Sequence, residues 1–366
     1  MRHQTAFLAI VFSISLAGCG SSQDSGAFGG AGGSGDVVLS GDGSGSAGAS
    51  GGGPMDTAGS GGSPLPPQSG LLTAGIWDDN LNFAEFEGYR DELWADDQSQ
   101  VDQRLFSNEE QEAAHAEAQA ESQLPTTLDV ALVIDTTGSM SDEITYLQTE
   151  FRDLSAEINA RYPGSQVRWS LVVYRDQGDE YVVRHNDFTD DPEAFRNSLA
   201  QQFATGGGDY PEAPDQALQL ANTLAWRGSG ATAKLAFWVA DAPPHVQNLP
   251  AFADSVRALG TSQVAIYPVA SSGVDESTEY FMRASAQRTG GRYIFITNDS
   301  GIGLDHKEPT ISCYYVTLLR DALLRAIDAE MLGEPGTPSA DEVIRSVGQP
   351  NASGLCVLEE GSAQAF

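Results

Sequence analysis

Short apolar stretches alternate with amphipathic stretches between residues 128 and 332. The apolar stretches, typical of buried strands, cover residues 128–134, 167–174, 235–240, 264–269 and 292–297. Residues 181–188 suit a strand that forms a hairpin with the second of these. The amphipathic stretches predict helices over residues 144–158, 192–203, 214–226, 252–259, 276–288 and 314–331. This alternation predicts an α/β domain over residues 128–332, with a doubly wound, mostly parallel, Rossmann-like sheet and helices on both faces.

The N-terminal residues have the pattern of a secretory signal. Arg2 and His3 precede a short apolar run, which is too short for a membrane span. The following Leu-Ala-Gly-Cys, which ends at Cys19, resembles a bacterial lipobox. The resemblance implies that residues 1–18 are removed and that Cys19 carries a diacylglyceryl anchor. An ordinary secretory signal is the alternative. Because Gly20 rather than Asp follows Cys19, we expect a cell-envelope lipoprotein of the outer membrane, on its periplasmic or surface side.

Three further segments flank the predicted domain. Residues 19–70 are rich in Gly, Ser and Pro and cannot bury enough surface to fold, so we expect a disordered tether. Residues 71–124 are acidic and predict an accessory segment that packs on the domain as a short additional layer. Residues 333–366 form a C-terminal tail that we expect to be weakly structured as far as Cys356.

The charge balance excludes several partners. Asp and Glu number 51 against 19 Lys and Arg, which gives a formal net charge of -32. The electrostatic field of so large a negative charge repels nucleic acid and anionic lipid, so we expect membrane contact through the lipid anchor only. Cations and cationic partners fit better. We expect a monomer that binds an unidentified protein partner.

Two cysteines remain beyond Cys19, namely Cys313 and Cys356. An oxidising compartment permits a disulfide between them, and it equally permits two free thiols. Sequence alone leaves both possibilities open, because pairing depends on the distance between the two residues.

Three polar turns are expected to meet at one edge of the sheet. The first strand ends in Asp135, followed by Thr137 and Ser139, and the strand at 235–240 is followed by Asp241. Residues 205–212 form a Gly-rich turn between them in the sequence. Ligands of doubly wound sheets bind beyond the carboxyl ends of the strands. Carboxylates and hydroxyls are the ligands of hard cations, so we expect Mg²⁺, with Ca²⁺ or Mn²⁺ as alternatives.

The Asp-x-Thr-x-Ser sequence at residues 135–139 resembles the metal-ion-dependent adhesion site of von Willebrand factor type A domains. The resemblance implies that Asp135, Thr137, Ser139 and Asp241 hold the cation. The family usually places a Thr in the middle loop, whereas this chain has Gly-Gly-Gly-Asp-x-Pro-Glu. We take Asp209 as the ligand from that loop, with Thr205 as the alternative. A third carboxylate would hold the cation more tightly and recruit partner carboxylates less strongly.

These observations predict cation-dependent protein binding or adhesion rather than enzymatic catalysis. The predicted domain, residues 128–332, lacks the second carboxylate of a haloacid-dehalogenase phosphatase, a Gly-x-Ser-x-Gly elbow and a Walker loop. His245 stands near the site without the setting of a catalytic triad. Two alternatives remain open: a structural or assembly lipoprotein without metal-linked binding, and a metal-dependent hydrolase.

Overall fold

A mixed sheet carries the fold. The computed structural model describes residues 72–93, 104–120, 124–141, 143–208, 210–228, 231–303, 305–333, 336–359 and 361–366. The predicted signal segment, Cys19 and the tether lie outside the described residues. Within the described ranges the strands are β1 (Thr73–Trp77), β2 (Thr127–Asp135), β3 (Gln166–Tyr174), β4 (Val183–Thr189), β5 (Thr232–Ala240), β6 (Ala265–Ala270), β7 (Tyr293–Thr297), β8 (Tyr314–Leu318), β9 (Arg345–Val347), β10 (Leu355–Leu358) and β11 (Gly361–Gln364).

The helices connect these strands in the expected alternation. They are α1 (Phe83–Leu93), α2 (Asn108–Ala118), α3 (Ile144–Arg161), α4 (Pro192–Ala200), α5 (Pro214–Ala221), α6 (Leu249–Thr261), α7 (Glu276–Thr289) and α8 (Leu319–Leu332). Short 3-10 turns are η2 (Gly138–Ser141), η3 (Val246–Asn248) and η4 (Asn298–Ser300). In the described part of the chain, no helix is long and apolar enough to cross a membrane.

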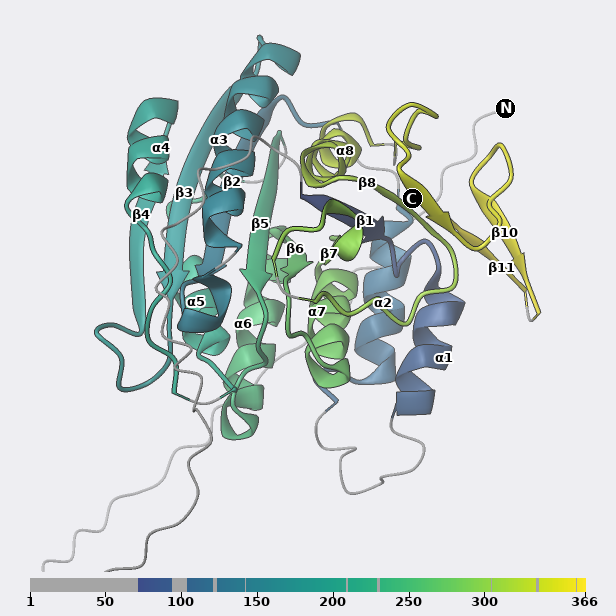
Figure 1. Ribbon diagram of the computed structural model, residues 1–366, viewed down its shortest axis with the longest axis horizontal. Coiled ribbons are helices and arrows are strands. Elements are labelled where there is room, and N and C mark those ends of the chain that lie inside the picture. Colours follow the sequence, from purple (N-terminus) through teal and green to yellow (C-terminus); the bar gives the residue numbers. More distant parts are fainter. Residues whose placement is uncertain are drawn as a thin grey trace, which may run out of the picture. The chain divides into compact units, whose positions relative to one another are not determined.

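The order of the main sheet is β4-β3-β2-β5-β6-β7-β1-β8-β9, and β10 and β11 form a separate two-stranded sheet (Figure 1). Strands β3, β2, β5, β6 and β7 are parallel. Strand β4 is the expected hairpin partner of β3 and runs antiparallel at the edge. The doubly wound, mostly parallel sheet predicted from the sequence is thus confirmed, although β1 and β9 add antiparallel strands at the other side.

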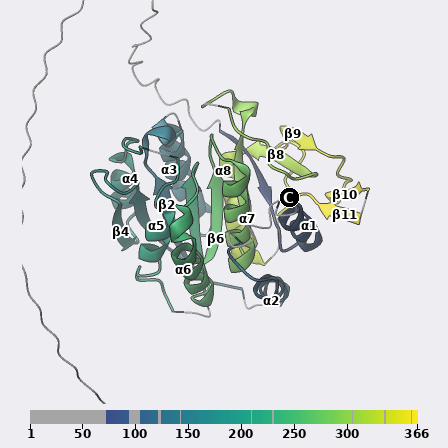
Figure 2. The ribbon, with the colours of Figure 1, turned by 90° about the horizontal axis from the view of Figure 1, so that it is seen from below.

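Helices cover both faces of the sheet (Figures 1 and 2). Alternate residues of β2 point to opposite faces, as the two-residue period of a strand requires. Ala131 and Val133 pack with α5, α6 and α7, whereas Val130, Leu132 and Ile134 pack with α3, α4 and α8. Because both faces are covered, the central strands are mostly apolar, and the polar residues of the predicted cation site follow the strand ends. The edge strand β4 is polar and largely exposed.

Two expectations about the termini of the domain need correction. Residues 314–331 form strand β8 followed by helix α8, not one helix; Tyr, Val and Thr in 314–318 favour a strand, and β1 supplies the partner. The segment before residue 124 is not only an added layer, since β1 lies between β7 and β8 within the sheet. Gly75 permits this position, because a Cβ there would lie 2.2 Å from the Phe295 ring.

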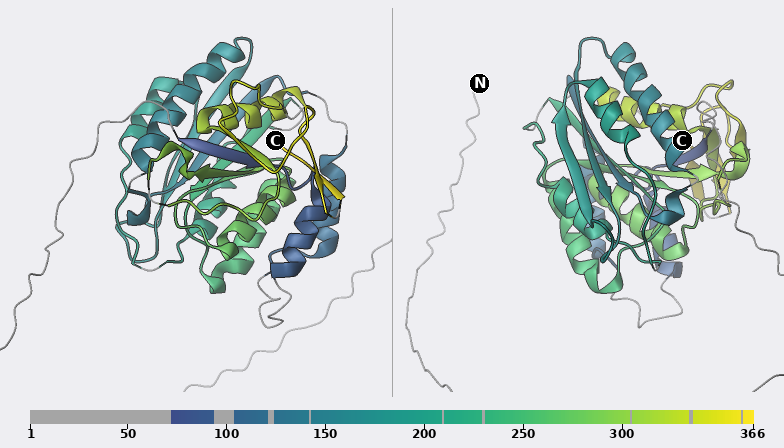
Figure 3. Two further views of the ribbon diagram at one scale, coloured as in Figure 1. Left: turned by 45° about the vertical axis from the view of Figure 1, so that its right-hand side comes forward. Right: turned by 60° about the vertical axis from the view of Figure 1, so that its left-hand side comes forward.

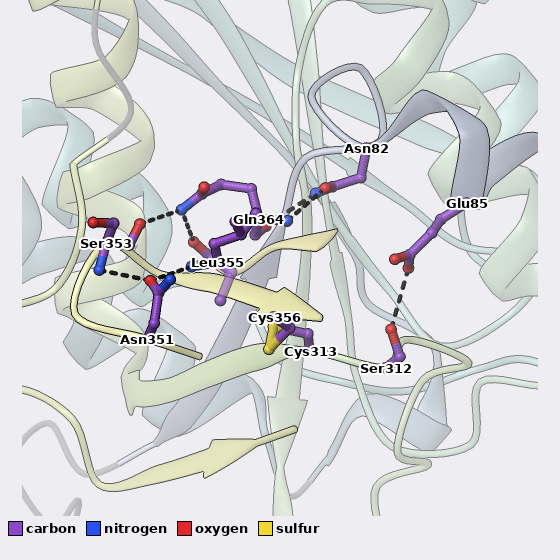
Figure 4. The surroundings of a disulfide bond; sticks show 10 residues. Asn82, Glu85, Ser312, Cys313, Asn351, Ser353, Leu355, Cys356 and Gln364 are labelled. Carbon is purple, nitrogen blue, oxygen red and sulfur yellow. Dashed lines mark hydrogen bonds between the residues drawn. A yellow bond between two sulfur atoms is a disulfide. The ribbon is translucent and has the colours of Figure 1, made fainter. Parts of the chain in front are cut away.

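The C-terminal tail is more structured than expected. Strand β9 pairs with β8 before Cys356 is reached. Cys313 and Cys356 are buried and form a disulfide, with Cα atoms 6.3 Å apart (Figure 4). Further along, the backbone of Gln364 exchanges two hydrogen bonds with the Asn82 side chain, at 2.8 and 3.0 Å. The tail is therefore fastened to the segment that carries β1.

Candidate functional site

Asp135 ends strand β2 and is fully buried. Its Oδ1 accepts hydrogen bonds from the Thr137 backbone N at 2.8 Å and from Thr137 Oγ1 at 2.7 Å. Its other oxygen, Oδ2, is buried without a hydrogen-bond partner among the described residues. An ionised carboxylate with a buried, unpaired oxygen is costly, and either a proton or a cation at this atom would lower that cost.

Two hydroxyls extend the first turn. Thr137 Oγ1 lies 3.2 Å from Ser139 Oγ, in the turn that leads into η2. Thr137 is buried and Ser139 is exposed. The motif therefore presents a carboxylate and two hydroxyls from the inside of the sheet edge towards solvent.

The Gly-rich loop lies against this turn. The Gly138 N donates to the Gly206 carbonyl at 3.0 Å, and the Thr205 N donates to the Thr136 carbonyl at 3.0 Å. Gly206 and Gly207 have φ angles of 83° and 72°, which only glycine adopts without strain. A Cβ on Gly207 would lie 2.9 Å from Glu212 Oε1 and 3.1 Å from Thr137 Cβ. Glycine thus allows the loop to pack directly on the motif.

Asp241 reaches the same edge from the neighbouring strand. Strands β2 and β5 pair in parallel, with Ile134 opposite Val239, so the residues that follow both strands lie side by side. Asp241 is buried, and its charge raises the pKa of Asp135. Asp135, Thr137 and Ser139 are therefore in one turn, and Asp241 stands next to it.

Glu212 is a residue of this site that the sequence analysis did not propose. It is buried beside Gly207 and Thr137, and its Oε2 has no hydrogen-bond partner in the described part of the chain. The Glu212 N donates to the Pro243 carbonyl at 3.0 Å, which ties the middle loop to the turn after Asp241. The sequence contained an indication of this role, because Glu212 is the last residue of Gly-Gly-Gly-Asp-x-Pro-Glu and carries a carboxylate.

The carboxyl groups at this edge oppose one another's ionisation. Burial and the charge of Asp241 raise the pKa of Asp135 to about 7, although hydrogen bonds from Thr137 act in the opposite direction. Burial and the charge of Asp135 are the two largest causes that raise the pKa of Glu212 to about 9. A positive ion among these groups would relieve both effects.

Of the two ligands proposed from the middle loop, the structure describes only Thr205. Asp209 lies outside the described residues. Thr205 is described and exposed, and its backbone bonds to Thr136. Within the described ranges, no three or more His, Cys, Asp or Glu side chains converge as a metal-binding group by themselves. A cation at this edge would therefore need the Thr137 and Ser139 hydroxyls or Asp209.

His245 pairs with an acid of the β3–β4 connection. Its Nε2 lies 2.8 Å from Asp176 Oδ1, at the start of the β3–β4 connection. Asp179, in the same connection, accepts a hydrogen bond from the Gly207 N at 2.9 Å. These contacts fix the loops around the site relative to one another.

The residues present fit a divalent cation. The donors are all oxygens, two buried carboxylate oxygens lack hydrogen-bond partners among the described residues, and the Gly-rich loop closes on them. Oxygen ligands of this kind suit Mg²⁺, Ca²⁺ or Mn²⁺.

The family model of the von Willebrand factor A domain matches residues 129–300, slightly less than half of the chain. The match begins in β2 and ends at η4, so it includes the three turns of the site. Fold, motif and match together support a von Willebrand factor A domain in this segment. Domains of this family generally mediate protein–protein interactions.

Curated relatives resemble only a short part of the chain. Human von Willebrand factor A domain-containing protein 7 is 39% identical over 92 residues, which are 25% of this chain and 10% of that protein. The rat protein of the same name is 37% identical over the same length. The chain thus spans about a tenth of the length of these relatives.

Solved structures show a distant likeness. The pilus adhesin SpaC from Lactobacillus rhamnosus GG is 12% identical with a TM-score of 0.35, over 46% of this chain and 30% of that one. The conserved hypothetical protein BatB from Bacteroides thetaiotaomicron is 11% identical with a TM-score of 0.38, over 57% of this chain and 100% of that one. Both are too distant to bear on function.

Proposed function

We propose that this chain is a lipid-anchored protein of the cell envelope whose von Willebrand factor A domain binds a divalent cation and, through it, a protein partner. The observation that carries the proposal is the unpaired Asp135 Oδ2, buried beside Asp241 and Glu212 among the described residues. No arginine or lysine hydrogen bond to Asp135 or Glu212 is found in the described ranges. A cation is the remaining source of positive charge.

The cation would be held by Asp135, Thr137, Ser139 and Asp241, with Asp209 or Thr205 from the middle loop. Glu212 adds a further carboxylate at the same place. When bound, Mg²⁺ supplies a positive centre with open coordination positions that an acidic side chain of a partner can fill. The exposed side of the site at Ser139 is where such a side chain would approach.

The anchor and the tether complete the proposal. Lipid on Cys19 would hold the chain at the outer membrane, and the Gly-rich residues 19–70 would let the domain reach roughly 40 Å from it. Protein partners of the envelope would then be accessible to the cation site.

Calorimetric titration of the mature chain with Mg²⁺, Ca²⁺ and Mn²⁺ tests the cation site. We expect saturable binding that Ser139→Ala and Asp241→Asn weaken by at least about tenfold, because each removes an oxygen ligand. Ser353→Ala, at an exposed serine of the tail, is the matched control and should bind as the wild type does. Equal affinity of Ser139→Ala and Ser353→Ala would refute the site.

Capture of partners from envelope extracts tests the function. We expect a partner that is retained with Mg²⁺, released by EDTA, and absent with Ser139→Ala. Retention that is indifferent to EDTA would instead support the structural or assembly alternative.

A further inference from the structure

A tyrosine of the middle loop, Tyr210, contacts a second connection of the sheet. Tyr210 belongs to the Gly-rich residues 205–212, which pack against the turn after β2. Its hydroxyl accepts a hydrogen bond from the Asp275 N at 3.2 Å. The same hydroxyl lies 3.2 Å from the Gly273 carbonyl and 3.1 Å from Thr278 Oγ1. Tyr210 thus links the middle loop to the β6–α7 connection and to the first turn of α7.

The hydrogen bonds of the Tyr210 hydroxyl can be assigned. Thr278 Oγ1 donates its hydrogen to Asp275 Oδ1 at 2.7 Å, so it can only accept from Tyr210. Tyr210 therefore donates to Thr278 Oγ1 or to the Gly273 carbonyl. Burial of the hydroxyl raises the pKa of Tyr210 to about 12, so the hydrogen is present at neutral pH. Because the residue as a whole is 43% exposed, these polar contacts rather than apolar burial hold it in place.

The contacts of Tyr210 lie beside the cation site. Strands β2, β5 and β6 run parallel, so the connections that follow them leave the sheet at the same edge (Figure 3). Strand β5 lies between β2 and β6, which places Asp241 between the Asp135 turn and the β6–α7 connection. A Cβ on Gly273 would lie 4.0 Å from Asp241 Cβ. Tyr210 therefore fastens the middle loop next to Asp241, on the side away from Asp135.

The middle loop needs such a contact because its glycines do not fix its path. Glycine loses more backbone freedom on ordering than any other residue. A Cβ on Gly208 would meet nothing within 4 Å, so packing does not restrain this part of the loop. The Glu212 N donates to the Pro243 carbonyl at 3.0 Å, which fixes the end of the loop. Tyr210 lies between Gly208 and Glu212 in the sequence, where its hydrogen bonds supply a further restraint.

We infer that Tyr210 is a positioning residue of the cation site, whose hydroxyl holds the middle loop so that the Glu212 carboxylate stays beside the other acids when the cation binds. The inference rests on the proposed cation site and adds a residue that sets its affinity. Tyr210 acts through Glu212, two residues later in the chain. The charges of Asp135 and Asp241 are among the causes that raise the pKa of Glu212, as expected for carboxyl groups that lie close together.

Calorimetric titration of the mature chain with Mg²⁺ tests the inference. Tyr210→Phe keeps the ring and removes only the hydroxyl, and we expect it to weaken Mg²⁺ binding about fivefold. In the Glu212→Gln background the same change should weaken binding by less than about twofold, since the carboxylate that Tyr210 positions is then absent. A tyrosine that only stabilises the fold would weaken binding equally in both backgrounds.

Tyr162→Phe is the matched control. Tyr162 follows the last residue of α3 and donates a hydrogen bond to Asp328, so this substitution also removes a bonded tyrosine hydroxyl. Helix α3 begins beside the site and has 18 residues, which places Tyr162 about 27 Å away along the helix. Tyr162→Phe should leave the Mg²⁺ affinity unchanged in both backgrounds.

Hydrogen exchange in EDTA tests the restraint on the loop without a cation. The backbone amides of residues 205–212 should exchange at least about threefold faster in Tyr210→Phe than in the wild type or in Tyr162→Phe. Unchanged exchange, unchanged Mg²⁺ affinity, or an equal loss of affinity in both backgrounds would overturn the inference. A wild type that binds no cation would refute the proposed function and the inference together, whereas a wild type and Tyr210→Phe that bind Mg²⁺ equally would refute the inference alone.

Discussion

Two clusters of buried carboxylates differ in what neutralises them. Glu279 and Arg283 belong to α7, and Asp79 packs against them. Arg283 donates to both acids: its Nη2 is 2.7 Å from Asp79 Oδ1, and its Nη1 is 3.2 Å from Glu279 Oε1. All three side chains are 1% exposed. Asp135 and Glu212 are also buried, and oxygens of both lack hydrogen-bond partners within the described ranges. Glu279 Oε2 lacks a hydrogen-bond partner there too, but it lies 3.7 Å from Lys307 Nζ.

The neighbours therefore act in opposite directions. Burial raises the pKa of Asp79, and Arg283 counteracts that rise. Burial also raises the pKa of Asp135, and there the nearby Asp241 adds to the rise. In the first cluster arginine and lysine side chains face the buried acids, whereas no arginine or lysine ion pair to Asp135 or Glu212 is found among the described residues. Burial of acids alone does not identify a functional site; the missing counter-charge does.

Arg283→Met should produce the largest effect, because it removes the cation that contacts Asp79 and leaves Glu279 with Lys307, 3.7 Å away. We expect the free energy of unfolding to fall by about 3–5 kcal/mol, measured by urea denaturation. Arg152→Met, at an exposed arginine, should change it by less than about 0.5 kcal/mol. A loss below about 1 kcal/mol for Arg283→Met would mean that the two clusters do not differ as described.

Mg²⁺ should stabilise only through the second cluster. At a free concentration of about 100 times its Kd, a ligand of the folded state adds about 2.7 kcal/mol, which thermal melting detects as a rise in Tm. Asp135→Asn should abolish the rise, and Arg283→Met should leave its size unchanged. Stabilisation that survives in Asp135→Asn would place the cation elsewhere.

The pH dependence of stability should also separate the clusters. A carboxyl group whose pKa is raised in the folded state favours folding while it is protonated, and this contribution is lost as the pH rises through the folded value. The ordinary pKa values of Asp135 and Glu212 are 3.8 and 4.5 and the folded values are about 7 and about 9, so unfolding in EDTA should become easier as the pH rises from about 4 to about 9. We expect a loss of about 1 kcal/mol, after allowance for solvent screening. Saturating Mg²⁺ should flatten the curve, and a curve that is flat already in EDTA would contradict the assignment.

The smallest effect concerns Glu212. Glu212→Gln should stabilise the cation-free protein by up to about 1 kcal/mol at alkaline pH, since it removes one of the repelling charges. The same substitution should weaken Mg²⁺ binding in calorimetry.

Comparison with Asp209→Thr identifies which acid of the middle loop binds the cation. The ligand is the residue whose substitution lowers the cation affinity more. Unchanged affinity in both variants would mean that neither Glu212 nor Asp209 is a ligand.

Much of the fold follows from local pattern. The apolar residues 128–134 and the helical spacing after Ile144 predict β2 and α3 because a buried strand and an amphipathic helix each repeat at their own period. The turn from Asp135 to Ser139 was identified for the same reason, since its position at the end of β2 is fixed by the strand before it. Asp241 followed from β5 in the same way.

Long-range pairing explains what local pattern missed. The apolar residues 73–77 are a strand only because β7 and β8 lie more than 200 residues later in the chain and offer free edges. Residues 314–318 were predicted as helix, since Leu318 continues the helical spacing of the leucines that follow. Glu212 was missed because its approach to Thr137 depends on the path of the Gly-rich loop, which no periodicity encodes.

The position of β1 has a practical consequence for anyone who expresses this protein in pieces. A fragment cut at residue 128, where the recognisable domain begins, would lack the strand that joins β7 to β8. The facing edges of β7 and β8 would then have unpaired backbone N–H and C=O groups. Such edges can pair with a strand of another chain and so promote aggregation. Fragments should therefore begin upstream of Leu72 and retain the C-terminal residues that Asn82 holds.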